Sequence, residues 1–182
     1  IILTMDFDLE QLRLELEKCR WDTGTLRRNM ATEKYSKKMI STTFGLTTRG
    51  ILNPSNRYRE KAPYAHYYWT TSYTRNKHLV PLFNNIAEKY FPDHKWTCIQ
   101  INRNYPIKPH KDNGNKGESV IVGFGGYSGG ELVVEDKEEP SVYDIKNKIL
   151  KFNGSEYTHY VKPFEGERWS LVFYSPLEAT EI

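Results

Sequence analysis

Apolar residues recur at three- to four-residue spacing in two parts of the chain, and each part predicts an amphipathic helix. The first part covers residues 6–20, where apolar side chains stand among Glu and Arg without Gly or Pro. Its apolar members are Phe7, Leu9, Leu12, Leu14 and Leu16. We expect this helix to brace a sheet. The second part covers residues 77–90 and is closed by Pro92.

After Trp96 the pattern changes to short runs of β-branched and aromatic residues, separated by Gly, Asn and Pro. These runs predict strands near 97–103, 107–112, 118–124, 131–135, 148–152, 158–163 and 168–174. Short strands with turns between them favour a sandwich or barrel over a parallel α/β sheet. Residues 21–75 carry few clean periodicities, so their pattern predicts no defined elements.

The length of 182 residues and a hydrophobic content of 38% suit one domain with one core. We expect residues 1–182 to form a single domain. In it, residues 1–95 would be a helical and irregular support region, and residues 96–182 would form the β core.

The composition says more about the cellular compartment of the protein than about its binding partners. Lys and Arg total 26 against 23 Asp and Glu, and a net charge of +3 is too small to indicate a polyanionic partner. Cys19 and Cys98 are the only cysteines, which argues against a disulfide framework and for a reducing compartment. No long apolar run or signal-peptide pattern is present. We therefore predict a soluble intracellular protein without membrane contact.

Two of the five histidines stand out by their neighbours. His66, His78 and His94 lie among aromatic, lysine or apolar residues that favour packing or surface roles. His110 is followed two positions later by Asp112, and on a strand this spacing places both side chains on one face. An imidazole and a carboxylate converging in this way are two of the three ligands of a metal-binding triad. The pair alone is weak evidence, because such spacing also arises by chance.

A third ligand is available in His159, the only histidine downstream of Asp112. It falls on the predicted strand 158–163, far enough along the chain for a small barrel to return beside His110. Two histidines and one carboxylate leave open positions on an octahedral metal, as in non-haem Fe(II) enzymes. Zinc more often takes a closed tetrahedral set. The alternative is that His159 is an ordinary strand histidine.

Arg168 and Ser170 favour the metal-site interpretation. They share one face of the predicted strand 168–174, while Trp169, Leu171 and Phe173 face the other way, into packing. A guanidinium beside a hydroxyl is suited to gripping a carboxylate. A cosubstrate that chelates iron through a keto acid and carries a distal carboxylate needs such an anchor.

These motifs, His110-Lys111-Asp112, His159 and Arg168-Trp169-Ser170, resemble those of the Fe(II)/2-oxoglutarate dioxygenase superfamily over about residues 96 to 175. The resemblance implies a mainly β double-stranded β-helix (jelly-roll, cupin-like) with supporting helices. It also implies Fe(II), 2-oxoglutarate and O2 as metal, cosubstrate and oxidant. Asn102 and Tyr105 match positions that often touch 2-oxoglutarate in related enzymes, although their spacing to His110 is short.

The activity implied by the resemblance is hydroxylation of a C–H bond, with release of succinate and CO2. Within the superfamily the chain is most similar to the TET and base-J-binding branch, which oxidises the 5-methyl group of pyrimidines in DNA. It matches AlkB-type enzymes less well, because Tyr174 stands where they have a second arginine. Two alternatives are a prolyl or amino-acid side-chain hydroxylase acting on a protein, and a non-enzymatic β-barrel binding module.

Residues 56–77 bear on the substrate, because cations and aromatic rings are interleaved there in the manner of nucleic-acid grooves. We take Arg57 and Arg59 as candidate phosphate contacts and Tyr67 and Trp69 as candidate base-stacking rings. The alternative is that these rings pack over the barrel while the cations are solvated.

A glycine-rich run at residues 123–130 resembles a phosphate-binding loop only superficially. It lacks the third glycine of the dinucleotide pattern and the Lys-Ser/Thr of the P-loop, and it leads into a predicted strand. We interpret it as a hairpin turn, whose Gly129-Gly130-Glu131-Leu132 is similar to a turn found in many of these oxygenases.

Overall fold

The computed structural model describes residues 4–21, 39–48 and 67–176, in which short helices precede a series of antiparallel strands. The helices are α1 (Thr4–Glu17), α2 (Thr71–Arg75), a short 3-10 helix (Lys77–Leu79) and α3 (Val80–Tyr90). The first strands are β1 (Ile40–Thr48), β2 (Tyr67–Trp69), β3 (Cys98–Arg103), β4 (Ser119–Phe124) and β5 (Tyr127–Gly129). The later strands are β6 (Leu132–Val134), β7 (Ser141–Tyr143), β8 (Leu150–Phe152), β9 (His159–Val161), β10 (Phe164–Gly166) and β11 (Trp169–Tyr174).

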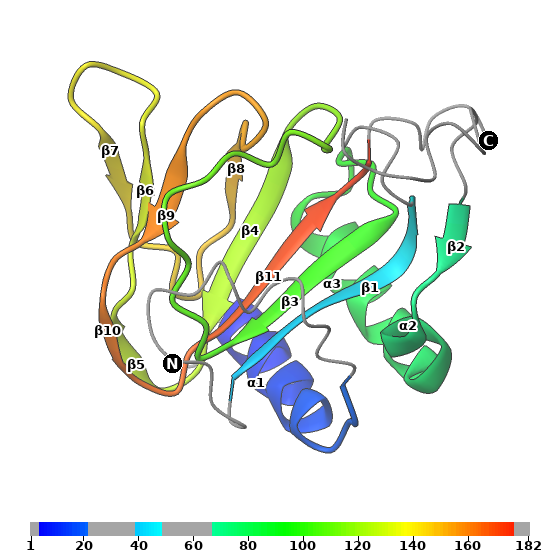
Figure 1. Cartoon of the computed structure of the whole chain (residues 1–182). Helices are drawn as coiled ribbons and strands as arrows, with labels where there is room; N and C mark the ends of the chain where they lie inside the picture. The colour runs from blue at the N-terminus through cyan, green and yellow to red at the C-terminus, as the bar shows by residue number, and fades with distance from the viewer. Residues whose placement is uncertain (1–3, 22–38, 49–66, 177–182) are drawn as a thin grey trace.

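The strands form a large sheet faced by smaller ones (Figure 1). The large sheet has the order β2-β1-β3-β11-β4-β8, and the smaller sheets have the orders β7-β6-β9 and β10-β5. All strand pairs in these sheets are antiparallel. Because β11 returns from the end of the chain to lie between β3 and β4, the order is that of a jelly roll rather than a meander. The predicted double-stranded β-helix is confirmed.

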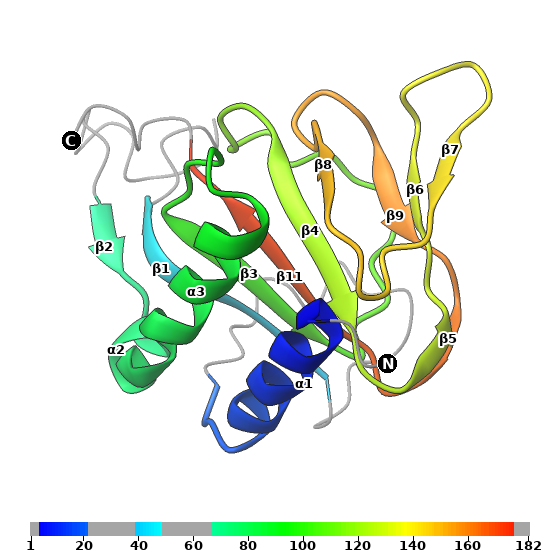
Figure 2. The ribbon, with the colours of Figure 1, turned by 180° about the vertical axis from the view of Figure 1, so that it is seen from behind.

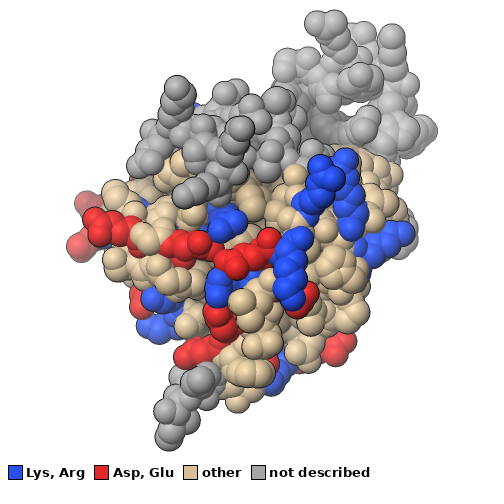
Figure 3. All heavy atoms as spheres, turned by 90° about the horizontal axis from the view of Figure 1, so that it is seen from below, with Lys and Arg blue, Asp and Glu red and all other residues tan. Residues whose placement is uncertain are grey.

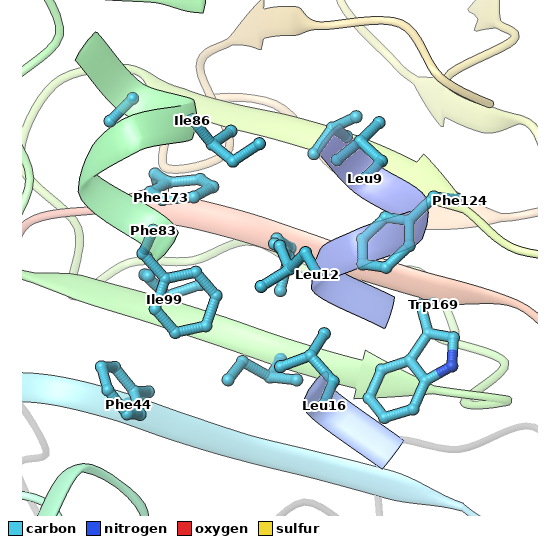
Figure 4. Packing of buried hydrophobic residues seen from close by; sticks show 14 of the residues in the cluster. Leu9, Leu12, Leu16, Phe44, Phe83, Ile86, Ile99, Phe124, Trp169 and Phe173 are labelled. Carbon is cyan, nitrogen blue, oxygen red and sulfur yellow. The ribbon is translucent and has the colours of Figure 1, made fainter. Parts of the chain in front are cut away.

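Helices α1 and α3 cover the face of the large sheet that is turned away from the small sheets (Figure 2). The main core lies between them and the sheet, and Figure 4 shows its side chains gathered there. Leu9, Leu12 and Leu16 of α1 recur at helical spacing and are all buried. On the sheet side, the buried partners are residues of one strand face, as the two-residue period requires. They include Phe44, Ile99, Phe124, Trp169, Leu171 and Phe173.

The predicted helices and most predicted strands are present. Residues 6–20 form α1, and residues 77–90 form the short 3-10 helix and α3. The strands predicted from residue 118 onward are found as β4, β6, β8, β9 and β11, several of them shorter than expected. Strand β1, which pairs with β3 along six residues of each, was not predicted. None of the described helices has both the length and the apolar character needed to cross a membrane.

The strand predicted at residues 107–112 is wrong. This segment is an extended loop whose backbone meets β9 at two points, the isolated antiparallel bridge between His110 and His159 and a hydrogen bond from the amide of Val161 to the carbonyl of Ile107. Pro106 and Pro109 explain the difference, because neither residue has an N–H to donate to a strand ladder.

Replacing Leu16 with alanine is expected to lower the free energy of unfolding by roughly 2–5 kcal/mol, the range for a fully buried leucine. Leu16 is 0% exposed in the core between α1 and the sheet. Leu14→Ala is the matched control, since Leu14 is 40% exposed on the same helix, and its effect should stay within about 0.5 kcal/mol. Urea titration measures both values. Equal losses in the two variants would contradict the packing of α1 described here.

Candidate metal centre

His110, Asp112 and His159 converge at the mouth of the jelly roll. The Nε2 atom of His110 lies 3.4 Å from Oδ1 of Asp112, and Nε2 of His159 lies 3.2 Å from Oδ2. One potential ligand atom from each residue lies within 4.8 Å of the others. The three side chains selected by the spacing argument do converge, although the residues from 107 to 112 are not a strand.

The backbone fixes which ring nitrogen each histidine offers. Nδ1 of His110 lies 2.9 Å from the carbonyl oxygen of Lys108, and Nδ1 of His159 lies 3.0 Å from that of Tyr157. A carbonyl oxygen only accepts, so Nδ1 carries the proton in both rings. Nε2 of each ring faces the Asp112 carboxylate and is the nitrogen that the ring can offer to a metal.

Local backbone pairing holds the three ligands close. His110 and His159 exchange two backbone hydrogen bonds, of 3.1 and 2.9 Å. The amide of Asp112 donates to the carbonyl of Gly154 at 2.8 Å. A Cβ atom on Gly154 would lie 3.0 Å from Cε1 of His159 and 3.2 Å from Oδ2 of Asp112, so a larger residue would crowd the cluster.

Asp112 is held in its ionised form. Burial raises the pKa of this carboxyl, but hydrogen bonds and charge interactions with His110 and His159 lower it further, and the net pKa is well below its usual value. A carboxylate that is ionised at neutral pH is ready to bind a divalent cation. Two imidazoles and one carboxylate on an otherwise open site are the ligand set of non-haem Fe(II) centres, so the residues present fit this metal.

A pocket extends from the triad between the large sheet and β9. Asn102 of β3 and Ser170 of β11 line it, and the two residues are direct cross-strand neighbours. Oδ1 of Asn102 accepts a hydrogen bond from Ser41 on β1 at 2.8 Å, whereas its buried Nδ2 has no partner among the described residues. The hydrogen bond from Ser41 fixes the orientation of the Asn102 amide and leaves its N–H group free to donate. A ligand with an acceptor oxygen would satisfy this N–H group.

Arg168 precedes Ser170 by two residues and is 2% exposed. Its guanidinium donates one hydrogen bond, from Nη2 to the carbonyl of Gly130 at 3.2 Å, and its buried Nε has no partner in the described part of the chain. Burial lowers the pKa of Arg168, and none of its ion-pair distances to a described carboxylate falls within 4.0 Å. A buried cation without an anion is costly, so the site is suited to an anionic ligand such as the distal carboxylate of 2-oxoglutarate.

The other candidate residues lie elsewhere. Tyr105 is buried just after β3 and does not line the pocket.

Trp69 is 54% exposed at the edge strand β2 and stacks on Tyr73 of α2, with ring centroids 4.3 Å apart. It borders an apolar pocket with core residues of the helix-bearing face, so it is not beside the metal centre. Tyr67 is half-buried on β2. The candidates Arg57 and Arg59 lie outside the described residues.

Comparisons with known proteins agree with the fold. No protein-family model and no curated protein matches the sequence. Among solved structures, NgTET1 in complex with 5mC DNA has a TM-score of 0.57 and 16% identity, over 97% of this chain and 70% of that chain. A 2OG-Fe(II) oxygenase family oxidoreductase from Burkholderia pseudomallei has a TM-score of 0.52 and 17% identity, over 91% and 77% of the two chains.

A third similar structure is a prolyl hydroxylase from Trichoplax adhaerens in complex with a hypoxia inducible factor oxygen degradation domain peptide fragment. It has a TM-score of 0.52 and 14% identity, over 94% of this chain and 78% of that chain. The chain therefore has the double-stranded β-helix fold of 2OG-Fe(II) oxygenases, and it carries two histidines and an aspartate in a geometry that fits Fe(II).

Proposed function

We propose that this protein is an Fe(II)- and 2-oxoglutarate-dependent oxygenase that hydroxylates a C–H bond. The convergence of His110, Asp112 and His159 carries this proposal, since it combines the ligand types and the open positions that such enzymes need. The buried guanidinium of Arg168 supports it independently, because a buried cation without a described anionic partner fits an anionic ligand such as the distal carboxylate of 2-oxoglutarate.

Each group has a separate role in the proposal. The triad holds the metal, with Nδ1–H of each histidine anchored to a backbone carbonyl. Arg168 and Asn102 bind 2-oxoglutarate through donors that have no partner among the described residues, and Ser170 adds its hydroxyl from the pocket wall. The bound metal and cosubstrate supply the oxidation of a C–H bond by O2, with release of succinate and CO2. Tyr105 stays a candidate contact for the cosubstrate.

Succinate release tests the proposal directly. Purified protein with Fe(II), ascorbate and 2-oxoglutarate would be incubated with pools of methylated DNA, RNA and peptides, and succinate would be measured by mass spectrometry. Substrate-dependent release that chelators abolish is the expected result. Failure to bind 2-oxoglutarate in the presence of a divalent metal would remove the oxygenase assignment.

We propose a nucleic-acid base, specifically a 5-methylpyrimidine, as the substrate. The fold similarity to NgTET1, which was solved with 5mC DNA, is one support. Another is the loop that carries His110 and Asp112, where the exposed Lys108 precedes His110 and the exposed Lys111 lies between His110 and Asp112. Cations at the mouth of the site can neutralise phosphates on either side of a base that enters it. Elsewhere on the surface, the face in Figure 3 carries acidic and basic side chains next to each other.

Lys111→Ala is expected to weaken DNA binding and to reduce the slope of log affinity against log salt by about 1, the value for one lost phosphate contact. Fluorescence anisotropy over a salt series measures the slope. Lys18→Ala is the control, because Lys18 is exposed in the turn directly after α1, at the helix-bearing face, and pairs with Glu15. The same slope in wild type and in Lys111→Ala would remove Lys111 from the interface.

A peptide substrate is the competing outcome. The Trichoplax prolyl hydroxylase shares the fold and was solved with a peptide fragment. If the protein shows no salt-dependent binding to DNA or RNA, and yet couples 2-oxoglutarate turnover to a peptide, the nucleic-acid proposal is wrong and a prolyl or side-chain hydroxylase takes its place.

A further inference from the structure

A second pocket lies at the β2 edge of the large sheet, between β1, β2, the helices α2 and α3, and the start of β3 (Figure 1). It has a volume of about 270 Å³, and five of the nine described residues that line it are aromatic. The five are Phe44, Trp69, Tyr73, Phe83 and Trp96. The proposed oxygenase chemistry uses none of them.

Two of these rings form an exposed stack at the rim of the aromatic pocket. Trp69 and Tyr73 lie 21° from parallel, with ring centroids 4.3 Å apart. Phe44, which is 3% exposed, contacts Tyr73 edge-on with centroids 5.4 Å apart, so the core supports the stack from below. Trp69 is nevertheless 54% exposed. Its indole therefore presents ring surface on which a flat ligand can stack.

Every charged side chain on the segments that form this pocket is a cation. Residues 39–48, 67–87 and 94–103 supply all of its described lining and contain no Asp or Glu. Arg75, Lys77 and Lys95 are exposed on these segments. Nζ of Lys77 lies 5.7 Å from the centroid of the Tyr73 ring, which places a positive charge beside the stack. Rings next to cations, without carboxylates between them, suit a ligand that combines flat rings with negative charge.

The aromatic pocket and the triad pocket reach the same end of the large sheet. Thr97 lines the aromatic pocket, and its amide donates to the carbonyl of Tyr174 at 3.0 Å. Tyr174 in turn lines the triad pocket. A polymeric ligand that crosses the start of β3 and the end of β11 can therefore reach both pockets at once.

We propose that the aromatic pocket binds an unpaired base of the nucleic-acid substrate, in the same strand as the base that enters the metal centre. This rests on the proposed function, because it takes nucleic acid as the substrate. Trp69 stacks on the base, and Lys77 neutralises an adjoining phosphate. Paired bases of a duplex stack on one another, so this pocket favours a single strand over a blunt duplex.

Fluorescence anisotropy with a labelled single-stranded oligothymidylate tests the stack. Trp69→Ala is expected to weaken binding roughly 5- to 150-fold, the range for one lost contact between a base and a ring. Trp69→Phe keeps a ring and should recover most of the affinity. Phe7→Ala is the matched control and should bind as wild type does, since Phe7 is also 54% exposed but lies between Asp6 and Asp8 on α1. Circular dichroism checks that each variant is folded.

A blunt duplex and a salt series separate base stacking from charge. Trp69→Ala should bind a blunt dA·dT duplex as tightly as wild type does, because this ligand has no unpaired base. Lys77→Ala should reduce the slope of log affinity against log salt for the single strand by about 0.7, the value for one lost phosphate contact. Lys18→Ala, which removes a lysine paired with Glu15, should leave that slope unchanged.

The outcomes distinguish this site from the proposed function. If the single strand binds wild type and is weakened by Lys111→Ala, but binds Trp69→Ala as tightly as wild type, the aromatic pocket is not a base site and the nucleic-acid substrate stands. If wild type binds no nucleic acid, both assignments are overturned, and 2-oxoglutarate binding with a divalent metal still decides the oxygenase assignment. If Trp69→Ala loses affinity for an acidic, aromatic peptide and not for the oligonucleotide, a protein partner occupies the pocket instead.

Discussion

Asp112→Ala is expected to reduce succinate release by more than about 100-fold. Loss even of a residue that only supports a metal ligand typically costs 10- to 100-fold in affinity or activity, and Asp112 would be a ligand itself. It is also the only carboxylate in the triad, so the two imidazoles left behind carry no charge to balance a divalent cation. Calorimetric titration with Mn(II) and a succinate assay with Fe(II) measure the two losses.

Asp93→Ala is the matched control for this substitution. Asp93 is an exposed carboxylate in the turn after α3, and it does not line the triad pocket. Its removal should leave metal affinity and turnover as in wild type. Circular dichroism should show folded protein for both variants. Undiminished turnover in Asp112→Ala would exclude this residue from the metal centre.

Arg168→Met is expected to weaken 2-oxoglutarate binding by about 30- to 1000-fold, because losing a charge-assisted bidentate contact costs on the order of 2 to 4 kcal/mol. The structure adds an expectation for the ligand-free protein. Replacing a buried, unpaired cation with an apolar side chain of similar volume should leave the melting temperature unchanged or raise it. Binding and stability should therefore change independently.

Calorimetry and thermal melting of the same samples test both parts. Arg103→Met is the control, since Arg103 lies on the opposite face of the sheet, where it pairs with Glu167 and covers the Trp169 ring. It should leave 2-oxoglutarate affinity unchanged. A parallel fall in stability and affinity for Arg168→Met would mean that the arginine is structural, and the anchor for the cosubstrate would have to lie elsewhere.

The face of each residue in β11 could be predicted from the sequence. Trp169, Leu171 and Phe173 enter the core under the helices, while Ser170 faces the pocket, as strand alternation requires. This prediction succeeded because alternate residues of a strand point to opposite faces of the sheet, whichever strands lie beside it. The fold class followed from the same patterns, repeated along the second half of the chain.

The convergence of the three candidate metal ligands was predicted, for a reason that was partly wrong. His110 and Asp112 do not share a strand, and their convergence depends on one bridge to His159 and on the amide of Asp112 bonding to Gly154. The spacing restricts how far apart the two side chains can lie in any extended segment. It does not reveal which distant backbone holds that segment in place.

Strand β1 escaped prediction because two of its buried residues are polar. Ser41 and Thr42 are buried, and they are satisfied by Asn102 and Ser72, which lie 61 and 30 residues away. Hydrophobic patterning cannot detect a strand whose burial is compensated by distant hydrogen bonds.

The bridge between His110 and His159 also affects the thermodynamics of metal capture. The two backbone hydrogen bonds join segments 49 residues apart in the folded chain, before a metal ion binds. The conformational entropy of closing that loop is therefore lost during folding and not during metal binding. Their Nδ1 anchors restrict the rings in the same way. The ligand set is thus preorganised, and metal affinity reflects mainly the exchange of water for imidazole and carboxylate rather than the ordering of the chain.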